Sequence, residues 1–452
     1  MRRELGVLHP DLLLRLHERH PDRYPVLLES VAGEPGLGRH DLLFALPGER
    51  LLRAADGSLS GPAAVTSAAT FLGALDAWQA DARSSTGDGG PAQFAGGWFM
   101  YLGYELAGEF EPRLKLRRSQ LPQAIAWRMR GALLRDRETG EVEFRAEDGV
   151  TSLACDQVTA DLADAADAVP PAAPPLALAL EEEDPQRFRR GVEAVLEAIA
   201  RGDVYQANLS RGWRARMPTG IGPAGLYRRL RTANPAPFAG SARLPGFDVL
   251  SSSPERLLRI EGTTASTRPI AGTRPRGATR EDDASLRTEL YLNEKERAEH
   301  VMLVDLERND LGRICRGGTV RVDEFMTIES YATVHHIVSN VSGELRPGVT
   351  PGQAIAAVFP GGTITGCPKL RCMELLAELE QEPRDAYTGS MGYLGSNGSL
   401  DLNILIRTLT LRGSRIDFRT GAGIVADSHP EAELAETRAK ARGLLRALGS
   451  DT

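Results

Sequence analysis

Residues 186–210 read QRFRRGVEAVLEAIARGDVYQANLS, and this stretch joins a helix pattern to a strand pattern. Apolar residues recur three and four positions apart from Phe188 to Ile199, which places them on one helix face, and Gly202 provides the end of the helix. Residues 204–210 then alternate in the way of a half-buried strand. The stretch therefore predicts a helix that leads directly into a strand.

Two further patterns lie near the C-terminus. Residues 404–410 (ILIRTLT) form a second strand pattern, and residues 430–448 form a long helix pattern with Ser428 as the expected cap and Pro430 in the first turn. These helices and strands do not follow a regular βαβ alternation. We therefore predict an α+β fold.

A proline-rich stretch marks the clearest boundary in the chain. Residues 169–175 read VPPAAPP, which cannot continue a helix or a central strand, and an acidic run follows it. We predict an N-terminal segment over residues 1–168, a linker over 169–184 and a second domain over 185–452. No internal repeat is visible.

The composition is ordinary for a globular protein, with 42% hydrophobic and 25% charged residues among 452. The 54 basic and 61 acidic residues give a net charge of −7, which argues against a nucleic-acid-binding protein. No apolar run is long enough for a membrane span, and the N-terminus does not resemble a signal peptide. We expect a cytoplasmic protein with no membrane partner, whose four cysteines are reduced thiols.

Carboxylates on two predicted helices are candidate metal ligands. Glu433, Glu436 and Lys440 are three and four positions apart and share a helix face, and Glu299 lies on another helix. Facing glutamates from two helices can hold Mg²⁺ and leave positions for substrate oxygens and water. A solvated, salt-bridged surface is the alternative for the same spacing.

Two glycine-rich stretches have different implications. Residues 361–369 are not a phosphate loop, because Cys367 and Pro368 stand where lysine and serine or threonine are required. Gly421, Ala422 and Gly423 follow a strand pattern, and backbone N–H groups there can approach an anion closely. A tight turn is the alternative explanation for these glycines.

Two polar residues interrupt apolar strand patterns. Arg407 needs an anionic partner if it is buried, and its donors suit a substrate carboxylate as well as an internal salt bridge. His336 lies in the run from Val334 to Val338, where a structural histidine and a catalytic one are both possible.

Together, these stretches resemble the chorismate-utilising enzymes, which include aminodeoxychorismate, anthranilate, isochorismate and salicylate synthases. The resemblance covers residues 187–446 in the family's order, and it rests on motifs at residues 202–210, 252–256, 268–276, 298–313, 359–369, 406–408 and 421–437. It implies the family's large layered β/α sandwich with antiparallel sheets.

The resemblance also assigns roles to site residues. It implies that chorismate is bound by Thr273, Tyr393, Arg407, Gly421, Ala422 and Gly423. It implies a Mg²⁺ ion on Glu299 and Glu436, with Glu433 close by. The implied catalytic residues are Glu255 as general acid, the ring-proximal His336, and Gln206 and Lys440.

The nucleophile follows from Gln206 within this resemblance. Water-using members have a lysine at this position that activates water, and a glutamine cannot act as that base. This implies ammonia as the nucleophile, supplied by a separate glutamine amidotransferase, because the chain shows no glutaminase constellation of its own.

The N-terminal segment resembles the two aminating branches more loosely. Residues 27–30 and 96–105 match that part of the family, and the first motif resembles a tryptophan pocket. Its members here are Leu28, Glu29, Ser30, Asn234, Pro235 and Phe238. Tryptophan is inhibitory in anthranilate synthases and structural in some aminodeoxychorismate synthases.

The product depends on Ala271. Aminodeoxychorismate synthases usually carry a nucleophilic lysine there, whereas anthranilate synthases carry alanine. Other motifs favour the aminodeoxychorismate branch, so we expect amination of chorismate to 4-amino-4-deoxychorismate, with anthranilate synthesis as the alternative. A degenerate, chorismate-binding regulatory subunit is disfavoured by the retained residues Glu255, Glu299, His336, Arg407, Glu433, Glu436 and Lys440.

Overall fold

The computed structural model describes residues 1–31, 38–63, 65, 67–85, 94–167, 176, 178–218, 220–331 and 334–450. The helices are α1 (Leu12–Arg19), α2 (Phe71–Ser85), α3 (Ala107–Phe110), α4 (Ser152–Asp167), α5 (Pro185–Ala200), α6 (Pro223–Ala233), α7 (Arg280–Leu292), α8 (Glu294–Gly312), α9 (Pro351–Val358), α10 (Lys369–Leu379) and α11 (Pro430–Ala447), with short 3-10 turns η1 (Tyr104–Leu106) and η2 (Gly362–Ile364).

The strands of the first segment are β1 (Arg2–Val7), β2 (Val26–Glu29), β3 (His40–Arg53), β4 (Leu59–Ser60), β5 (Gly97–Leu102), β6 (Ala124–Asp136) and β7 (Glu141–Ala146). The later strands are β8 (Leu180–Glu182), β9 (Gln206–Arg216), β10 (Phe238–Leu244), β11 (Phe247–Ser253), β12 (Arg256–Glu261), β13 (Thr264–Arg268), β14 (Ile270–Pro275), β15 (Arg321–Ser330), β16 (Val334–Glu344), β17 (Gly366–Cys367), β18 (Ser390–Gly395), β19 (Leu400–Asn403), β20 (Thr408–Arg412) and β21 (Arg415–Ile424).

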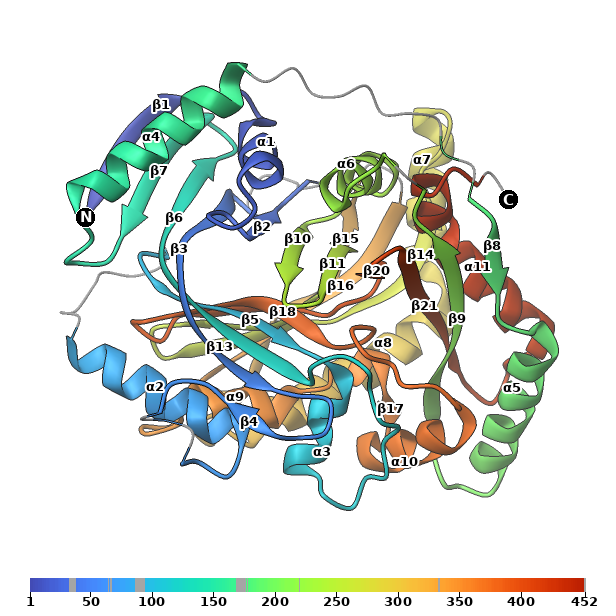
Figure 1. Ribbon diagram of the computed structural model, residues 1–452. Helices are drawn as coiled ribbons and strands as arrows, with labels where there is room; N and C mark the ends of the chain where they lie inside the picture. Colours follow the sequence, from blue (N-terminus) through green and yellow to red (C-terminus); the bar gives the residue numbers. More distant parts are fainter. Residues whose placement is uncertain are drawn as a thin grey trace.

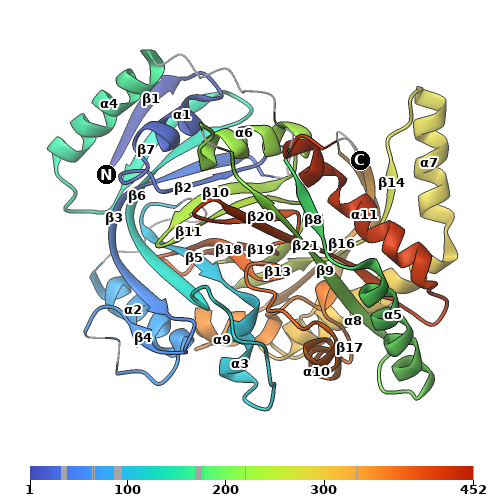
Figure 2. The same ribbon diagram turned by 45° about the vertical axis from the view of Figure 1, so that its right-hand side comes forward.

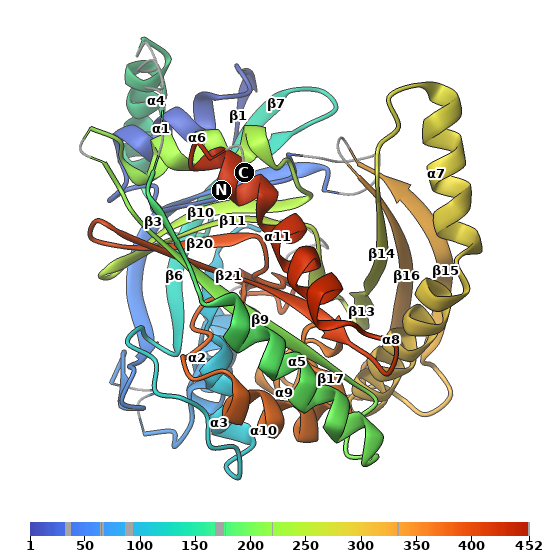
Figure 3. The same cartoon turned by 90° about the vertical axis from the view of Figure 1, so that its right-hand side faces the viewer.

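The strands form the centre of the molecule and the helices lie around them, which confirms the α+β prediction (Figure 1). The strand pairs described here are antiparallel, as in the long β9–β21 ladder, where Gly423 lies opposite Asn208. Helices α5 and α11 cover β9 and β21 on one side of the molecule (Figure 2). On another side, α7 and α8 pack against β14 and β16 (Figure 3).

Strands from both sides of the proline-rich stretch belong to the same sheet. β2 pairs with β10, and β5 pairs with β18 in a register that places Met100 opposite Gly392. Half of the predicted linker, residues 169–175 and 177, lies outside the described residues. The boundary between two segments at this stretch remains a prediction. The structure shows that strands of both segments pair in one sheet.

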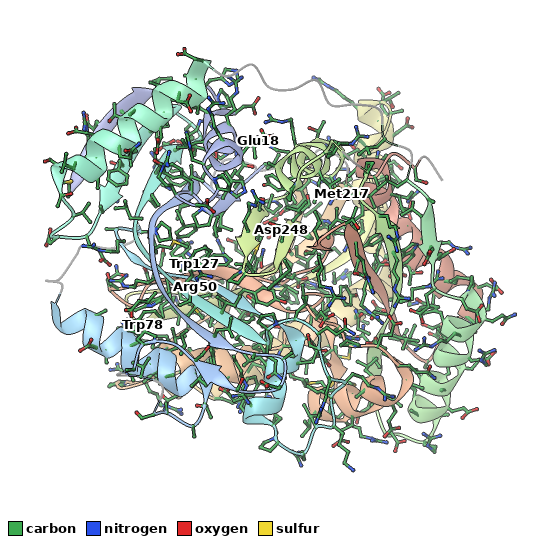
Figure 4. The ribbon with its side chains drawn as sticks, in the orientation of Figure 1. Glu18, Arg50, Trp78, Trp127, Met217 and Asp248 are labelled. Carbon is green, nitrogen blue, oxygen red and sulfur yellow. The ribbon has the colours of Figure 1, made fainter. Side chains whose placement is uncertain are left out.

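The hydrophobic core also draws on both segments. One cluster of buried side chains contains Trp98 and Met100 from β5 together with Leu394 and Leu402 from β18 and β19. Trp78 of α2 lies edge-on to Trp98, with ring centroids 5.4 Å apart. Nearer the surface, Arg50 stacks over the ring of Trp127 at 4.5 Å, and both side chains are labelled in Figure 4.

Two local predictions need correction. Residues 404–410 are not one strand: β19 ends at Asn403, β20 begins at Thr408, and Arg407 lies at a bend between them with φ of 53°. Ser428 does not cap α11, because His429 is the N-cap and the Ser428 hydroxyl instead accepts a hydrogen bond from the Val425 backbone N–H at 3.0 Å. The predicted helices, one with its apolar face from Phe188 to Ile199 and one over residues 430–448, are confirmed as α5 and α11.

Candidate active site

A large cavity lies where β9, β14, β16, α8 and α11 converge, and its volume is about 960 Å³. In Figure 3, α11 lies over β21 and begins on the side of the molecule where α8 lies, with β14 and β16 beyond it. Acidic and basic side chains line the cavity, and these are Glu255, Arg274, Lys295, Glu296, Glu299, His336, Arg407, Arg419, Glu433, Glu436, Lys440, Arg442 and Arg446. A cavity of this size and polarity suits a small, multiply charged molecule.

Glu255 is a buried carboxyl in the turn between β11 and β12. Its pKa is raised to about 8, mainly by burial and in addition by the nearby Glu307, against the opposing effects of Thr363 and Arg407. Its Oε1 atom has no hydrogen-bond partner among the described residues. Glu255 therefore holds a proton near neutral pH and is placed to donate it to a molecule in the cavity.

His336 and Thr273 lie opposite each other on β16 and β14. The His336 Nδ1 atom donates to the Gly272 carbonyl at 3.1 Å and lies 3.0 Å from Thr273 Oγ1. Burial lowers the pKa of His336 to about 4, so the ring is neutral at physiological pH. With the proton on Nδ1, the Nε2 atom is left as a hydrogen-bond acceptor.

The three candidate metal ligands lie on α8 and α11 and line the same cavity. The pKa of Glu299 is raised to about 7, mainly by burial and in addition by Glu296, Glu436 and Glu433, against the opposing effect of Lys295. Glu433 Oε2 is buried without a hydrogen-bond partner in the described part of the chain. Carboxylates that repel one another in this way fit a site completed by a cation.

The arrangement is not a preformed metal cage. Among the described residues, no group of three or more His, Cys, Asp or Glu side chains is close enough to hold a metal ion. Glu436 forms an ion pair with Lys440 at 2.6 Å. Mg²⁺ is commonly bound by one or two carboxylates together with substrate oxygens and water, so the residues present still fit this ion.

The absence of side chains on the glycines of β21 lets its backbone lie close to two polar side chains of β9. A Cβ atom on Gly423 would lie 2.5 Å from Gln206 Nε2, and one on Gly421 would lie 2.4 Å from Asn208 Oδ1. Gln206 is buried, and its Oε1 atom has no partner among the described residues. Lys440 donates to the Gly421 carbonyl at 3.1 Å.

Between these glycines, Ala422 faces the other way because side chains alternate along a strand. Its side chain is buried in the cluster under α5 and α10, and Ala422 is not among the residues that line the cavity.

Arg407 lines the cavity from its bend between β19 and β20. Burial lowers its pKa, against the opposing effects of Tyr387, Glu255 and Glu436. The guanidinium group remains a cation at any physiological pH, and its donors are suited to a carboxylate. The structure therefore places an anion-binding group close to the proton-holding Glu255.

Tyr393 is not part of the cavity, which corrects the prediction for this residue. It lies within β18 and packs edge-on against Phe94, with ring centroids 5.6 Å apart. Tyr387 lines the cavity instead, and a Cβ atom on Gly421 would lie 2.6 Å from its hydroxyl. Tyr387 could have been identified from its position in the chain, because it lies in the loop before the strand and functional residues concentrate in loops.

Ala271 lines the cavity together with its neighbours on β14. Lys369, one of the lysines in the matched motifs, is directed elsewhere: it pairs with Asp310 and donates to the Val358 carbonyl at 3.1 Å. Within the described ranges, Lys295 and Lys440 are the lysines that line the cavity, and sequence reasoning missed Lys295.

Two residues of the predicted tryptophan pocket lie on β2 and are placed beside β10 by the β2–β10 pairing. In this register Leu28 lies opposite Gly240 and Glu29 lies opposite Ala239. Glu29 accepts from the Tyr227 hydroxyl at 2.8 Å and lies 3.4 Å from Arg231.

The remaining members of this predicted pocket differ in their surroundings. Ser30 is buried, and its backbone N–H donates to Asp41 at 3.1 Å. Asn234 and Pro235 line the edge of the large cavity, and Phe238 lies under the guanidinium of Arg256 at 4.9 Å.

The fold and the cavity of this chain can be compared with those of known proteins. Residues 48–446 match the model of the chorismate binding enzyme family, so the chain belongs to this family. Among solved structures, anthranilate synthase component I from Streptococcus pneumoniae has a TM-score of 0.77 and 29% identity, covering 91% of this chain and 92% of that one. An isochorismate synthase from Escherichia coli, at 18% identity and a TM-score of 0.72, shares the fold.

Curated relatives carry names from two branches. An "anthranilate synthase component I-like protein" from Synechocystis is 44% identical over 361 residues, which is 78% of this chain and 73% of that protein. "Aminodeoxychorismate synthase component 1" from Bacillus subtilis is 51% identical over 261 residues, 58% of this chain and 55% of that protein. The chain thus spans only about half the length of the second relative.

None of the helices in the described part of the chain is long and apolar enough to cross a membrane.

Proposed function

We propose that this chain catalyses the Mg²⁺-dependent amination of chorismate to 4-amino-4-deoxychorismate, with ammonia supplied by a glutamine amidotransferase partner. The observation that carries the proposal is the Gln206 amide, which lines the cavity that also contains the protonated Glu255. An amide cannot take a proton from water, whereas neutral ammonia attacks without a base.

In this proposal the substrate carboxylates face the cationic side of the cavity. Arg407 binds one carboxylate, and the backbone of Gly421 and Gly423 together with the Thr273 hydroxyl contributes further donors and close approach. Tyr387 replaces Tyr393 in this set. The neutral His336 packs against the ring without adding charge.

Glu255 then performs the central proton transfer. Its proton passes to the departing 4-hydroxyl, which leaves as water while nitrogen forms its bond to the ring. Glu299 and Glu436 would hold Mg²⁺ with Glu433 close by, and the bound ion would neutralise a substrate carboxylate. Lys440 positions Glu436 and the Gly421 backbone through its two contacts.

The amidotransferase partner is supported by the names of the relatives. Both names contain a component number, which implies a second component. In this proposal the enzyme acts in the cytoplasm, and the segment over residues 1–168 contributes Leu28, Glu29 and Ser30 to the tryptophan pocket.

The test is to incubate the pure chain with chorismate, Mg²⁺ and an ammonium salt, and to identify the product by mass and fluorescence. We expect amination with ammonia alone, and glutamine-dependent activity only when an amidotransferase is added. Formation of isochorismate or salicylate from water would contradict the proposal.

Anthranilate synthesis is the second candidate, and Ala271 favours it. A lysine at this position would supply a nucleophilic amine, and the alanine that lines the cavity supplies none. If the proposal is right, ammonia attacks directly, and Ala271→Lys raises the yield of 4-amino-4-deoxychorismate relative to anthranilate. The measurement is product partitioning by chromatography for both proteins, and a wild type that makes only anthranilate promotes this second candidate.

A further inference from the structure

Arg384 is a buried arginine behind the wall of the cavity, with all five of its guanidinium N–H groups in use. Two donate to the carboxylate of Glu380, each at 2.7 Å. The others donate to the Asn208 carbonyl at 2.7 Å, the Ile364 carbonyl at 3.1 Å and the Thr388 hydroxyl at 3.3 Å. The group is therefore held in one orientation by three separate segments of the chain.

The partners of Arg384 include cavity residues. Asn208 and Ile364 line the cavity, and so does Tyr387, whose ring lies 5.6 Å from the guanidinium carbon. Through these contacts Arg384 fixes β9, η2 and the loop before β18 relative to one another. Arg384 itself does not line the cavity.

Glu380 extends the same network to a further cavity residue. Its Oε1 atom accepts from the backbone N–H and the hydroxyl of Ser210, both at 2.8 Å. The Ser210 hydroxyl in turn accepts from Arg419, which lines the cavity, at 3.0 Å.

The N-terminal segment supports Arg384 from its other side. The Tyr104 ring lies 4.8 Å from the guanidinium carbon, a cation–π distance. Glu105 accepts from the backbone N–H groups of Arg384 and Asp385 at 2.8 and 3.1 Å. The position of Arg384 therefore depends on residues from both sides of the proline-rich stretch.

We propose that Arg384 is a positioning residue for the reaction. It holds Tyr387 and Asn208 in place at the cavity, and the positions of these two residues depend through Arg384 on Tyr104 of the N-terminal segment. This inference rests on the proposed chorismate amination. Displacement of cavity groups by about 1 Å can lower the rate of an enzyme by two orders of magnitude, so the effect should be measurable.

The test compares Arg384→Lys with a matched control, Arg211→Lys. Arg211 is equally buried on β9, is paired with Glu182 and stacks on Trp213 at 4.9 Å, but does not line the cavity. We expect Arg384→Lys to lower kcat/KM for chorismate by about tenfold or more, with a raised KM, because lysine cannot hold three segments at once. Arg211→Lys should stay within about twofold of wild type.

Thermal unfolding of both variants provides the comparison for stability. Equal kinetic losses at equal loss of stability would overturn the inference, since Arg384 would then act on folding alone. A wild type that does not consume chorismate would instead refute the proposed function.

A second pair of variants tests the inference if Arg384→Lys does not fold. Tyr104→Phe keeps the ring under the guanidinium, and the Tyr104 hydroxyl has no hydrogen-bond partner among the described residues. Tyr104→Leu removes the ring. We expect the leucine variant to raise KM for chorismate by about threefold or more over the phenylalanine variant. Equal KM values for the two would overturn the inference.

Discussion

At the scale of single residues, the proposed chemistry depends on three side chains that line the cavity. Glu255, His336 and Arg407 were expected to share one site, and the structure brings all three to the cavity wall. Tyr393 was expected there as well, but it packs partly buried against Phe94, and Tyr387 lines the cavity in its place. Which side of a strand faces a cavity depends on tertiary packing, and a motif alone does not contain that information.

The raised pKa of Glu255 leads to a prediction about pH. A carboxyl group with a pKa of about 8 is protonated below that pH, so a general acid at this position is lost as pH rises. We therefore expect kcat to fall as pH increases through about 8. The measurement is kcat against pH at saturating chorismate and a constant concentration of neutral ammonia.

Glu255→Gln is the companion variant, because the amide keeps the shape and cannot donate the same proton. Loss of general acid catalysis is expected to cost about 10²- to 10⁴-fold in kcat. The fall in activity at high pH should disappear in this variant. If Glu255→Gln keeps the same alkaline fall, another group is responsible and the assignment is wrong.

At the scale of helices and strands, periodicity predicted the regular elements and missed the interruptions. α5 and α11 follow from their apolar spacing. The bend at Arg407 did not, because its positive φ interrupts an apolar run that reads as one continuous strand. The family resemblance implied that glutamates of α8 and α11 share a site. The geometry of the approach of α8 to α11 was beyond the sequence, since it depends on how both helices pack against β14, β16 and β21.

That approach allows the proposed metal site to be tested with two variants of one helix. Glu436→Gln removes a charge from the cavity, whereas Glu431→Gln removes one from the exposed side of α11, where Glu431 pairs with Arg189 at 2.6 Å. We expect only Glu436→Gln to lower activity at limiting Mg²⁺, by about tenfold or more.

Activity should be measured as a function of Mg²⁺ concentration, with thermal unfolding as a check on the fold. Because Glu436 is half-exposed, its loss should change stability little. Full activity of Glu436→Gln at limiting Mg²⁺ would refute its role as a ligand.

At the scale of the whole molecule, the proline-rich stretch separates two segments in sequence that are joined in the sheet. Composition indicates such a boundary, but it does not reveal that β5 pairs with β18 about 290 residues later. Non-local strand pairing of this kind has no local sequence signal. The sequence therefore predicted a boundary between two segments of the chain. It did not predict that the two segments form one sheet and one hydrophobic core.

This shared core predicts that the second segment does not fold alone. A fragment of residues 185–450 would expose the edge of β18 and lose the packing of Trp98, Met100 and Leu102, which are fully buried. Burial of each large apolar side chain contributes about 1.5–3 kcal/mol, so these three alone amount to about 5–9 kcal/mol. That loss is comparable with the whole stability of a typical protein, about 5–15 kcal/mol.

We therefore expect the isolated fragment to aggregate, since an uncovered strand edge and apolar surface favour association. Co-expression with a fragment of residues 1–175 should restore a soluble complex, because β2 and β5 can then pair with β10 and β18. The measurements are solubility and the cooperativity of thermal unfolding for the fragment, the complex and the intact chain. Cooperative unfolding of the isolated 185–450 fragment would show that it is an independent domain. In that case the second segment would fold without the contacts of Tyr104 and Glu105 with Arg384.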